Sequence, residues 1–224
     1  MVPHLHNFLS VQHVAHRFVV LNQTDHFRFN RASLINVGWY ESDRLGCDYM
    51  VMHDVDILPL NPELNYEYPG KSRVKHISSG KYHPILRYDY KKFIGGVLML
   101  TLEDFKMVNG MSNKYWGWGL EDDEFFLRLK EANLTANILR PTNLTTDRSN
   151  TFRHIHAKER KRDYTLLYNQ KQMSRKRDRI SGLNTVRYRI VSRSLLNFGE
   201  AQASVLNIEL FCDRSWTPYC EFPS

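Results

Sequence analysis

Two aspartates interrupt an otherwise apolar stretch, YMVMHDVDILPLNPEL, which begins at residue 49. A carboxylate without a partner is costly to place among apolar side chains, so Asp54 and Asp56 need a neutralising group. Side chains two positions apart on a strand point to the same side. Both carboxylates could therefore reach one divalent cation, which could in turn bridge to a diphosphate. The alternative, given equal weight, is a pair of aspartates that cap a turn before Pro59.

His154 and His156, in TFRHIH, show the same spacing. If this segment is extended, both imidazoles face one way and can bind the same ion. Two histidines and one carboxylate with open coordination positions suit Mn²⁺ or a similar first-row metal better than Mg²⁺. The chain contains 10 histidines, so a surface strand with two incidental histidines is the competing interpretation. That interpretation weakens if the aspartates bind a metal, because the two pairs together complete a coordination shell.

The segment MSNKYWGWGLEDDEFF, residues 111–126, combines aromatic and acidic side chains. Trp116 and Trp118 alternate with glycines, and the four residues 121–124 are all acidic. Acidic residues at a helix start are favoured by the helix dipole, which is the simplest explanation. Aromatic faces also stack on sugar rings, and a neighbouring carboxylate can take a proton from a sugar hydroxyl. Because capping does not need four acids beside two tryptophans, the segment favours a sugar site.

Two further stretches are less specific. Tyr88 and Tyr90, in RYDYKKF, would share one side of a strand and could form a wall for an acceptor, although core packing or surface exposure is equally compatible with their spacing. The basic segment 158–179 is most simply a solvated helical face. It could also be a lid over phosphates or a nucleic-acid patch.

Composition bounds the protein class and its partners. The chain has 224 residues, of which 42% are hydrophobic and 25% charged, so it can form one domain with a real core. A net charge of +7 favours acidic partners without choosing among them. No apolar run is long enough to cross a bilayer, and the opening residues do not have the pattern of a signal peptide.

Cysteines and glycosylation sequons bear on the compartment. The three cysteines cannot form a complete disulfide framework, but Cys212 and Cys220 could pair in an oxidising compartment. Sequons at Asn22, Asn133 and Asn143 are a mild indication of a secretory lumen.

Hydrophobic periodicity predicts strands interleaved with helices, which indicates a single α/β domain. Asn30 is the predicted N-cap of the first helix, and Gly110 closes the second. The stretch 60–92 reads as a loop region with edge strands. The predicted strands cover residues 16–22, 48–58, 93–101, 151–156, 186–196 and 204–212, and the predicted helices cover residues 29–39, 102–110 and 121–134.

Taken together, these stretches resemble the beta-1,4-galactosyltransferase family, most closely its proteoglycan-linker branch. WGWGLEDDEF is a specific signature, whereas D-x-D alone is not. HIH stands where other branches carry a methionine ligand, which indicates the branch with a xylose acceptor. The resemblance covers nearly the whole chain and is carried by FNRASLINVG at 29–38, HDVDILPLN at 53–61, FIGGVLML at 93–100, NGMSNKYWGWGLEDDEF at 109–125, FRHIH at 152–156 and GLNTVRY at 182–188.

The resemblance implies a GT-A type glycosyltransferase fold, with a mixed central sheet and helices on both faces. It implies inverting transfer of galactose from UDP-galactose to the 4-hydroxyl of xylose on a proteoglycan core protein, in the Golgi lumen. Asp122 would be the general base. Mn²⁺ would be held by Asp56, His154 and His156. The acceptor would be bound by Tyr88, Tyr90, Trp118, Leu120, Glu121 and Asp123, and the donor by Phe29, Arg31, Asp54, Val55 and Trp116. The basic stretch after His156 would close over the donor.

In that family a strand ending in a Pro-Phe-Arg turn precedes the first helix, and a membrane anchor lies further upstream. The chain begins past that point, so residues 1–224 are expected to form one GT-A-like catalytic domain without this strand and anchor, and with weak activity. Two other classes compete with this interpretation. One is a metal-dependent phosphoesterase using the same aspartates and histidines. The other is a basic nucleic-acid-binding module built on residues 153–179.

Overall fold

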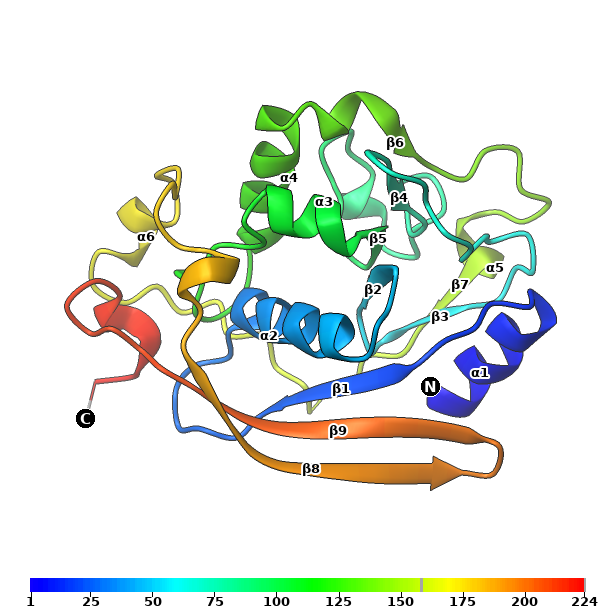
Figure 1. The fold of residues 1–224 in the computed structure, drawn as a ribbon. Coiled ribbons are helices and arrows are strands. Elements are labelled where there is room, and N and C mark those ends of the chain that lie inside the picture. Colours follow the sequence, from blue (N-terminus) through cyan, green and yellow to red (C-terminus); the bar gives the residue numbers. More distant parts are fainter. Residues whose placement is uncertain (158, 224) are drawn as a thin grey trace.

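The computed structural model describes residues 1–157 and 159–223. Its strands form three sheets, with helices packed between and around them (Figure 1). The helices are α1 Val2–Val11, α2 Arg31–Arg44, α3 Leu102–Met107, α4 Glu121–Glu131, α5 Arg148–Thr151 and α6 Gln170–Met173. The strands are β1 Phe18–Gln23, β2 Tyr49–His53, β3 Ile57–Pro59, β4 Val74–His76, β5 Val97–Thr101, β6 Ile138–Leu139, β7 Phe152–His154, β8 Tyr188–Phe198 and β9 Ala201–Leu210.

A four-stranded sheet has the order β2-β5-β4-β6 and contains the most buried strand. Every residue of β5 is buried, and β5 pairs antiparallel with both β2 and β4. The predicted strand over 93–101 is therefore confirmed in its second half. Its two glycines precede the strand, and Gly96 adopts a φ of +81°, which favours glycine.

A second sheet has the order β1-β9-β8, with β1 and β9 parallel. Strands β8 and β9 form a long antiparallel hairpin at the lower edge of the molecule (Figure 1). The two predicted C-terminal strands are thus confirmed. The hairpin continues past residue 196 to a turn at Gly199, whose φ is +69°.

The continuous strand predicted over 48–58 is wrong, because β2 and β3 belong to different sheets. Val55 and Asp56 form a turn, in which the Ile57 amide donates to the Asp54 carbonyl at 3.4 Å. The chain then pairs with β7, where Ile57 lies opposite His154. This two-stranded sheet brings the aspartate motif beside the histidine motif.

Helix α2 begins as predicted, because the Asn30 side chain accepts a hydrogen bond from the Ser33 amide. It does not end near Gly38 but continues to Arg44. A Cβ at Gly38 would lie 2.9 Å from a methyl group of Leu21, so the glycine permits close contact with β1. The helix packs between the two larger sheets, and its buried residues belong to two different apolar clusters.

The helices differ from the prediction in three further respects. Helix α1 is absent from the prediction, although Leu5 and Leu9 form its buried face at helical spacing. Helix α4 ends at Glu131 rather than at the predicted residue 134, and its Leu127 is exposed. The basic segment is mostly irregular apart from the short helix α6, and its first residue, Lys158, lies outside the described residues.

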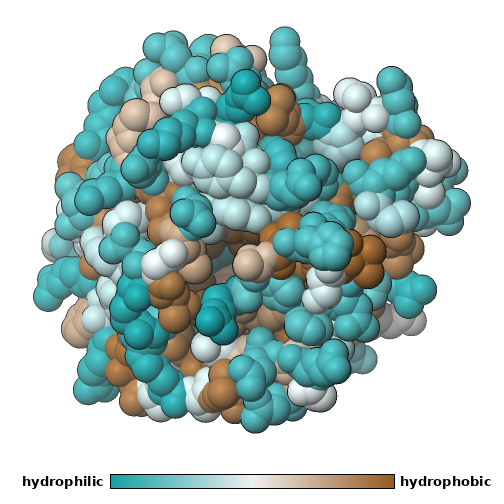
Figure 2. Space-filling model, turned by 45° about the vertical axis from the view of Figure 1, so that its right-hand side comes forward, coloured by the Kyte–Doolittle hydropathy of each residue, from teal (hydrophilic) through white to brown (hydrophobic). Residues whose placement is uncertain are grey.

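A disulfide joins Cys212 and Cys220, as the sequence allowed. Figure 2 shows one face of the molecule, where hydrophilic residues predominate and apolar ones are scattered among them. Within residues 1–157 and 159–223, no helix has the length and apolarity needed to span a membrane.

Candidate active site

The turn after β2 and the end of β7 bring three potential metal ligands together. The Asp56 Oδ2 lies 3.3 Å from both the Nε2 of His154 and the Nδ1 of His156. The two imidazole rings are nearly parallel, with 4° between their planes. The Nε2 of His156 is 2.7 Å from the Arg160 carbonyl, so this nitrogen carries the proton and Nδ1 is free to bind a metal.

The chemistry of this donor set fits Mn²⁺. Two imidazole nitrogens and one carboxylate oxygen all lie within 4.8 Å of one another. All three side chains remain partly exposed, so further positions around an ion stay open to a ligand. Asp54 is not part of this group within the described residues, so the idea that both aspartates reach one cation is wrong. The reason is the turn at 54–56, which removes the strand alternation on which that idea rested.

Asp54 is neutralised by an arginine instead. The Arg31 guanidinium, on the first turn of α2, donates to the Asp54 Oδ1 from Nε at 3.0 Å and from Nη2 at 2.6 Å. Its Nη1 lies 3.7 Å from Glu121 at the start of α4. Burial alone would lower the pKa of Arg31, but the surrounding carboxylates outweigh it and the pKa is raised. Arg31 thus links the aspartate turn to the acidic helix start.

Three of the acids at the start of α4 are partly buried side by side. Burial, followed by the charges of Glu121 and Asp123, raises the pKa of Asp122 to about 7, and Arg31 opposes this rise. Burial is also the main reason for the raised pKa values of Glu121 and Asp123. A carboxylate whose pKa lies near neutrality can accept a proton from a hydroxyl group and release it again.

The glycines before β5 make room for Asp122. A Cβ at Gly95 would lie only 2.8 Å from the Asp122 Oδ2. The Gly95 carbonyl is held by the Ser78 hydroxyl at 3.0 Å and by the Nε2 of His76 at 2.8 Å. Burial lowers the pKa of His76 to about 3, so its ring is neutral and donates to that carbonyl. These contacts fix the backbone against which the Asp122 carboxylate rests.

Aromatic side chains gather beside the acids. Tyr88 stacks on Phe93 with 4.8 Å between ring centroids, and Tyr90 lies 5.6 Å from the same ring. Burial raises the pKa of Asp123, and the Tyr90 side chain opposes that rise. The two tyrosines do not share a strand, because Leu86–Tyr88 is a turn of 3₁₀ helix. They meet through Phe93 rather than through strand alternation.

The two tryptophans differ sharply in exposure. Trp118 is 44% exposed, and its ring packs edge-on against Tyr164 of the basic segment. Trp116 is only 3% exposed and packs against Phe27 in an apolar cluster. Trp118 is therefore the ring available for stacking on a ligand. Val55, Phe29 and Leu120 are exposed, and Leu120 adopts an unusual φ of 73° just before α4.

Comparison with known proteins agrees with this geometry. Residues 1–69 match the N-terminal region of glycosyl transferase group 7, and residues 75–155 match a profile described as the N-terminal domain of galactosyltransferase. The xylosylprotein 4-beta-galactosyltransferase of Caenorhabditis elegans is 59% identical over 222 residues, which cover 98% of this chain and 75% of that protein. The chain belongs to the beta-1,4-galactosyltransferase family.

Other members of the beta-1,4-galactosyltransferase family extend this likeness. Beta-1,4-galactosyltransferase 7 of Drosophila melanogaster is 51% identical, with 98% of this chain and 67% of that protein covered. The crystal structure of the Drosophila catalytic domain in complex with xylobiose superposes with a TM-score of 0.94 at 50% identity, covering 99% of this chain and 92% of that chain. A mutant of that enzyme with manganese, UDP-Gal and xylobiose gives the same TM-score at 49% identity. The expected GT-A type fold is confirmed.

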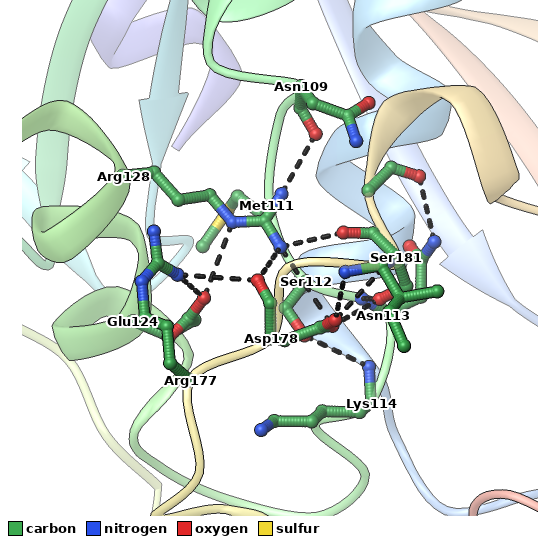
Figure 3. Close-up of polar contacts among 12 residues, drawn as sticks. Asn109, Met111, Ser112, Asn113, Lys114, Glu124, Arg128, Arg177, Asp178 and Ser181 are labelled. Carbon is green, nitrogen blue, oxygen red and sulfur yellow. Dashed lines mark hydrogen bonds and ion pairs between the residues drawn. The ribbon is translucent and has the colours of Figure 1, made fainter. Parts of the chain in front are cut away.

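A buried polar network, not anticipated from the sequence, anchors the acidic helix of this galactosyltransferase (Figure 3). Arg128 of α4 donates to the carbonyls of Asn109 and Ser181 at 3.0 and 2.6 Å, and to those of Gly110 and Asp178. The Asp178 carboxylate accepts hydrogen bonds from the hydroxyls of Ser112 and Ser181. The end of the basic segment is therefore bound to the core, which contradicts its interpretation as a solvated helical face. Its Arg177 pairs with the buried Glu124 in the same network.

Proposed function

We propose that the chain transfers galactose from UDP-galactose to the 4-hydroxyl of a xylose linked to a proteoglycan core protein. The observation that carries this proposal is Asp122, a carboxylate at the start of α4 that rests against Gly95, has a pKa of about 7 and follows the exposed Trp118 by four residues. Its relatives named for this activity, and the related structure with UDP-Gal and xylobiose, support the choice of donor and acceptor.

Asp56, His154 and His156 would hold Mn²⁺. When bound there, Mn²⁺ would supply positive charge to the diphosphate of the leaving group. The related structure that contains manganese together with UDP-Gal supports this choice of metal. On the protein side, Arg31 and Asp54 would contact the nucleotide, and the two hydrogen bonds from Arg31 orient Asp54 for that contact. Phe29 and Val55 are exposed and stay predicted donor contacts.

Asp122 would act as the general base. It would accept the proton of the xylose 4-hydroxyl as that oxygen attacks the donor carbon from the face opposite the leaving group, which inverts the configuration in one displacement. Glu121 and Asp123 would grip neighbouring hydroxyls of the acceptor. Removing such a base should cost at least ~100-fold in rate.

The acceptor wall would be formed by three exposed side chains and the half-buried Tyr88. The ring of Trp118 would stack on the sugar, with Tyr88, Tyr90 and Leu120 around it. Trp116 stays a predicted donor contact, but it is buried in this conformation, so such a contact requires the loop 116–119 to rearrange.

We infer a Golgi-lumenal location, in a type II membrane protein. The Cys212–Cys220 disulfide suits an oxidising compartment. The sequon asparagines Asn22, Asn133 and Asn143 are all exposed and so accessible to glycosylation. Neither the phosphoesterase nor the nucleic-acid interpretation explains the WGWGLEDDEF stretch, and part of the basic segment is occupied by internal ion pairs.

The test is a transfer assay with UDP-galactose and a xyloside acceptor, with glucose and N-acetylglucosamine as competing acceptors. We expect Mn²⁺-dependent transfer that prefers the xyloside and falls at least ~100-fold in Asp122→Asn. A matched control is Asp43→Asn, a surface change on α2. Phosphate release without sugar transfer, or equal use of the three acceptors, would contradict the proposal.

A further inference from the structure

The segment that carries the acceptor-wall residues Tyr88 and Tyr90 is strongly basic. Residues 81–92, KYHPILRYDYKK, contain four basic side chains and a single acid, Asp89. The Asp89 carboxylate accepts a hydrogen bond from the Arg148 Nη2 at 2.7 Å, so its charge is already matched from outside the segment. The four cations are exposed, and none of them forms an ion pair within the part of the chain that the structure describes: Lys81, Arg87, Lys91 and Lys92.

Two arginines from elsewhere in the chain hold this basic segment in place. Arg148 donates from Nη1 to the carbonyls of Gly80 and His83, at 2.7 and 2.6 Å. Arg140 donates from Nη2 to the Lys91 carbonyl at 2.9 Å. The backbone is therefore tied to the rest of the protein near both of its ends, and the exposed cations project from a defined support.

Two of the four cations act directly on the acceptor wall. The Arg87 guanidinium carbon lies 4.8 Å from the centroid of the Tyr88 ring, and the Arg87 Nη2 donates to the Tyr88 hydroxyl at 2.8 Å. Burial raises the pKa of Asp123, and the Tyr90 side chain and the charge of Lys92 oppose that rise. One cation is thus bound at Tyr88, and a second acts on the carboxylate proposed to grip the acceptor.

The chemistry of a bound xylose places its linkage to serine on this side. C1 and C4 lie at opposite ends of a pyranose ring, so a xylose whose 4-hydroxyl meets Asp122 directs its glycosidic bond away from that carboxylate. Asp122 is partly buried, whereas Arg87 and Tyr90 are exposed and Leu86 is 70% exposed. The peptide attached to the sugar would therefore leave the site over residues 86–92.

We propose that Arg87 and Lys92 bind acidic side chains that flank the xylosylated serine, so that the chain prefers acidic acceptor peptides to neutral ones. This inference rests on the proposed function and extends it from the sugar to the polypeptide that bears it. An exposed ion pair contributes little on its own. Because the peptide is joined covalently to the bound sugar, its carboxylates are held near the two cations at a high effective concentration, and weak pairs add to the affinity.

The first experiment measures the binding of labelled peptides by fluorescence anisotropy. It uses Asp122→Asn with Mn²⁺ and UDP-galactose, so that a bound acceptor is not consumed. The probes carry one xylosylated serine flanked either by glutamates or by glutamines. In about 50 mM salt we expect the glutamate peptide to bind about five- to tenfold more tightly, and in about 0.5 M salt the two affinities should agree within about twofold.

Two outcomes of the binding experiment would overturn the proposal. One is equal affinity for the two xylosylated peptides in low salt. The other is a glutamate peptide without xylose that binds as tightly as the xylosylated one, because the basic side chains would then form a general anion-binding surface and not a part of the acceptor site.

Charge-neutral variants locate the contact. In Arg87→Gln combined with Lys92→Gln, the affinities for the two xylosylated peptides should agree within about twofold even in low salt. The matched control combines Arg17→Gln with Arg189→Gln, which removes two exposed cations from the β1-β9-β8 sheet, away from the acceptor wall, and should keep the preference. Equal loss of the preference in both pairs of variants would show that net charge alone sets it, and would contradict the proposal.

Transfer kinetics separate this inference from the proposed function. The ratio of kcat/KM for the glutamate peptide to kcat/KM for the glutamine peptide should be about five or more, and should fall to within about twofold of unity in the Arg87→Gln, Lys92→Gln pair. The ratio cancels any effect of these substitutions on the sugar pocket itself. No transfer to either peptide would contradict the proposed function, whereas equal transfer to both would contradict this inference alone.

Discussion

Arg31 donates two hydrogen bonds to a single oxygen of Asp54, at 3.0 and 2.6 Å, while its third nitrogen faces Glu121 at 3.7 Å. One guanidinium therefore connects the aspartate turn with the helix start that carries Asp122. The first aspartate of HDVD is neutralised by this side chain, and the second is left to face His154 and His156. Burial is the main reason why Asp122 takes up a proton readily, and the charges of Glu121, Asp123 and Arg31 modify its pKa further.

The pH dependence of galactose transfer should follow the pKa of Asp122. Because the pKa of Asp122 is about 7, kcat/KM should fall as the pH drops below about 7 and the base becomes protonated. Glu121 raises this pKa, so Glu121→Gln should move the acid limb to lower pH. Arg31 lowers it, so Arg31→Gln should move the limb to higher pH, each by about 0.5–1 unit. Profiles of kcat/KM against pH would test this, and shifts in the same direction would contradict it.

Asp122 should also make the folded state less stable at high pH. Folding raises the pKa of Asp122 from 3.8 to about 7. Its favourable contribution to the free energy of unfolding is therefore complete below about pH 4 and is lost as the pH rises through 7. Asp122→Asn should therefore increase the free energy of unfolding at pH 8, on the order of 1–4 kcal/mol, and have little effect near pH 4. Denaturant unfolding at both pH values measures this. A stabilisation independent of pH would rule out a charge effect.

Activity should require glycine at position 95, because a side chain there would displace Asp122. Its backbone conformation accepts alanine, but the new Cβ would press on the Asp122 Oδ2 and on the Phe93 ring, both 2.8 Å away. Gly95→Ala should reduce kcat by about 10²-fold, because small displacements of a reacting group are costly. Gly46→Ala is a control for lost stability alone: a Cβ there meets no atom within 4 Å, but the φ of +69° disfavours alanine, so stability should fall while kcat is kept. If both variants keep full activity, Gly95 does not position the base.

The two tryptophans should respond oppositely to truncation. Trp116→Ala removes a buried ring and should lower the free energy of unfolding by about 3–5 kcal/mol. Trp118→Ala should leave thermal stability nearly unchanged and raise the KM for a xyloside about tenfold, because its ring is exposed just before the start of α4. Thermal melts and acceptor titrations distinguish the two. A large stability loss in Trp118→Ala would contradict the assignment.

The sequence predicted those features that depend on local patterns. The capped start of α2, the buried strand β5 and the C-terminal hairpin follow from side chains within a few residues of one another. The sequence also predicts that Asp56 and the two histidines share a metal ion, because carboxylate and imidazole side chains are common metal ligands. The turn that separates Asp54 from Asp56 was not predictable, because D-x-D fits a strand and a turn equally well.

Long-range contacts explain the remaining differences. The Arg28 Nε donates to the Asp163 Oδ2 across 135 positions of the sequence, and nothing in FRFN indicates a buried cation. Arg128 follows Phe125 by three residues and so lies on the buried face of α4, where its guanidinium fills a site lined by backbone carbonyls. Such sites exist only once the loops have folded over them, so no local pattern records them.

The most direct test of the metal centre is a Mn²⁺ titration of the chain and two variants, followed by electron paramagnetic resonance. Asp56→Asn should weaken Mn²⁺ binding at least ~100-fold, since it removes the charged ligand from the group formed with His154 and His156. Asp54→Asn should bind Mn²⁺ within about threefold of the unchanged chain, because Arg31 already neutralises that carboxylate. Equal loss of Mn²⁺ binding in both variants, or none in Asp56→Asn, would contradict the account.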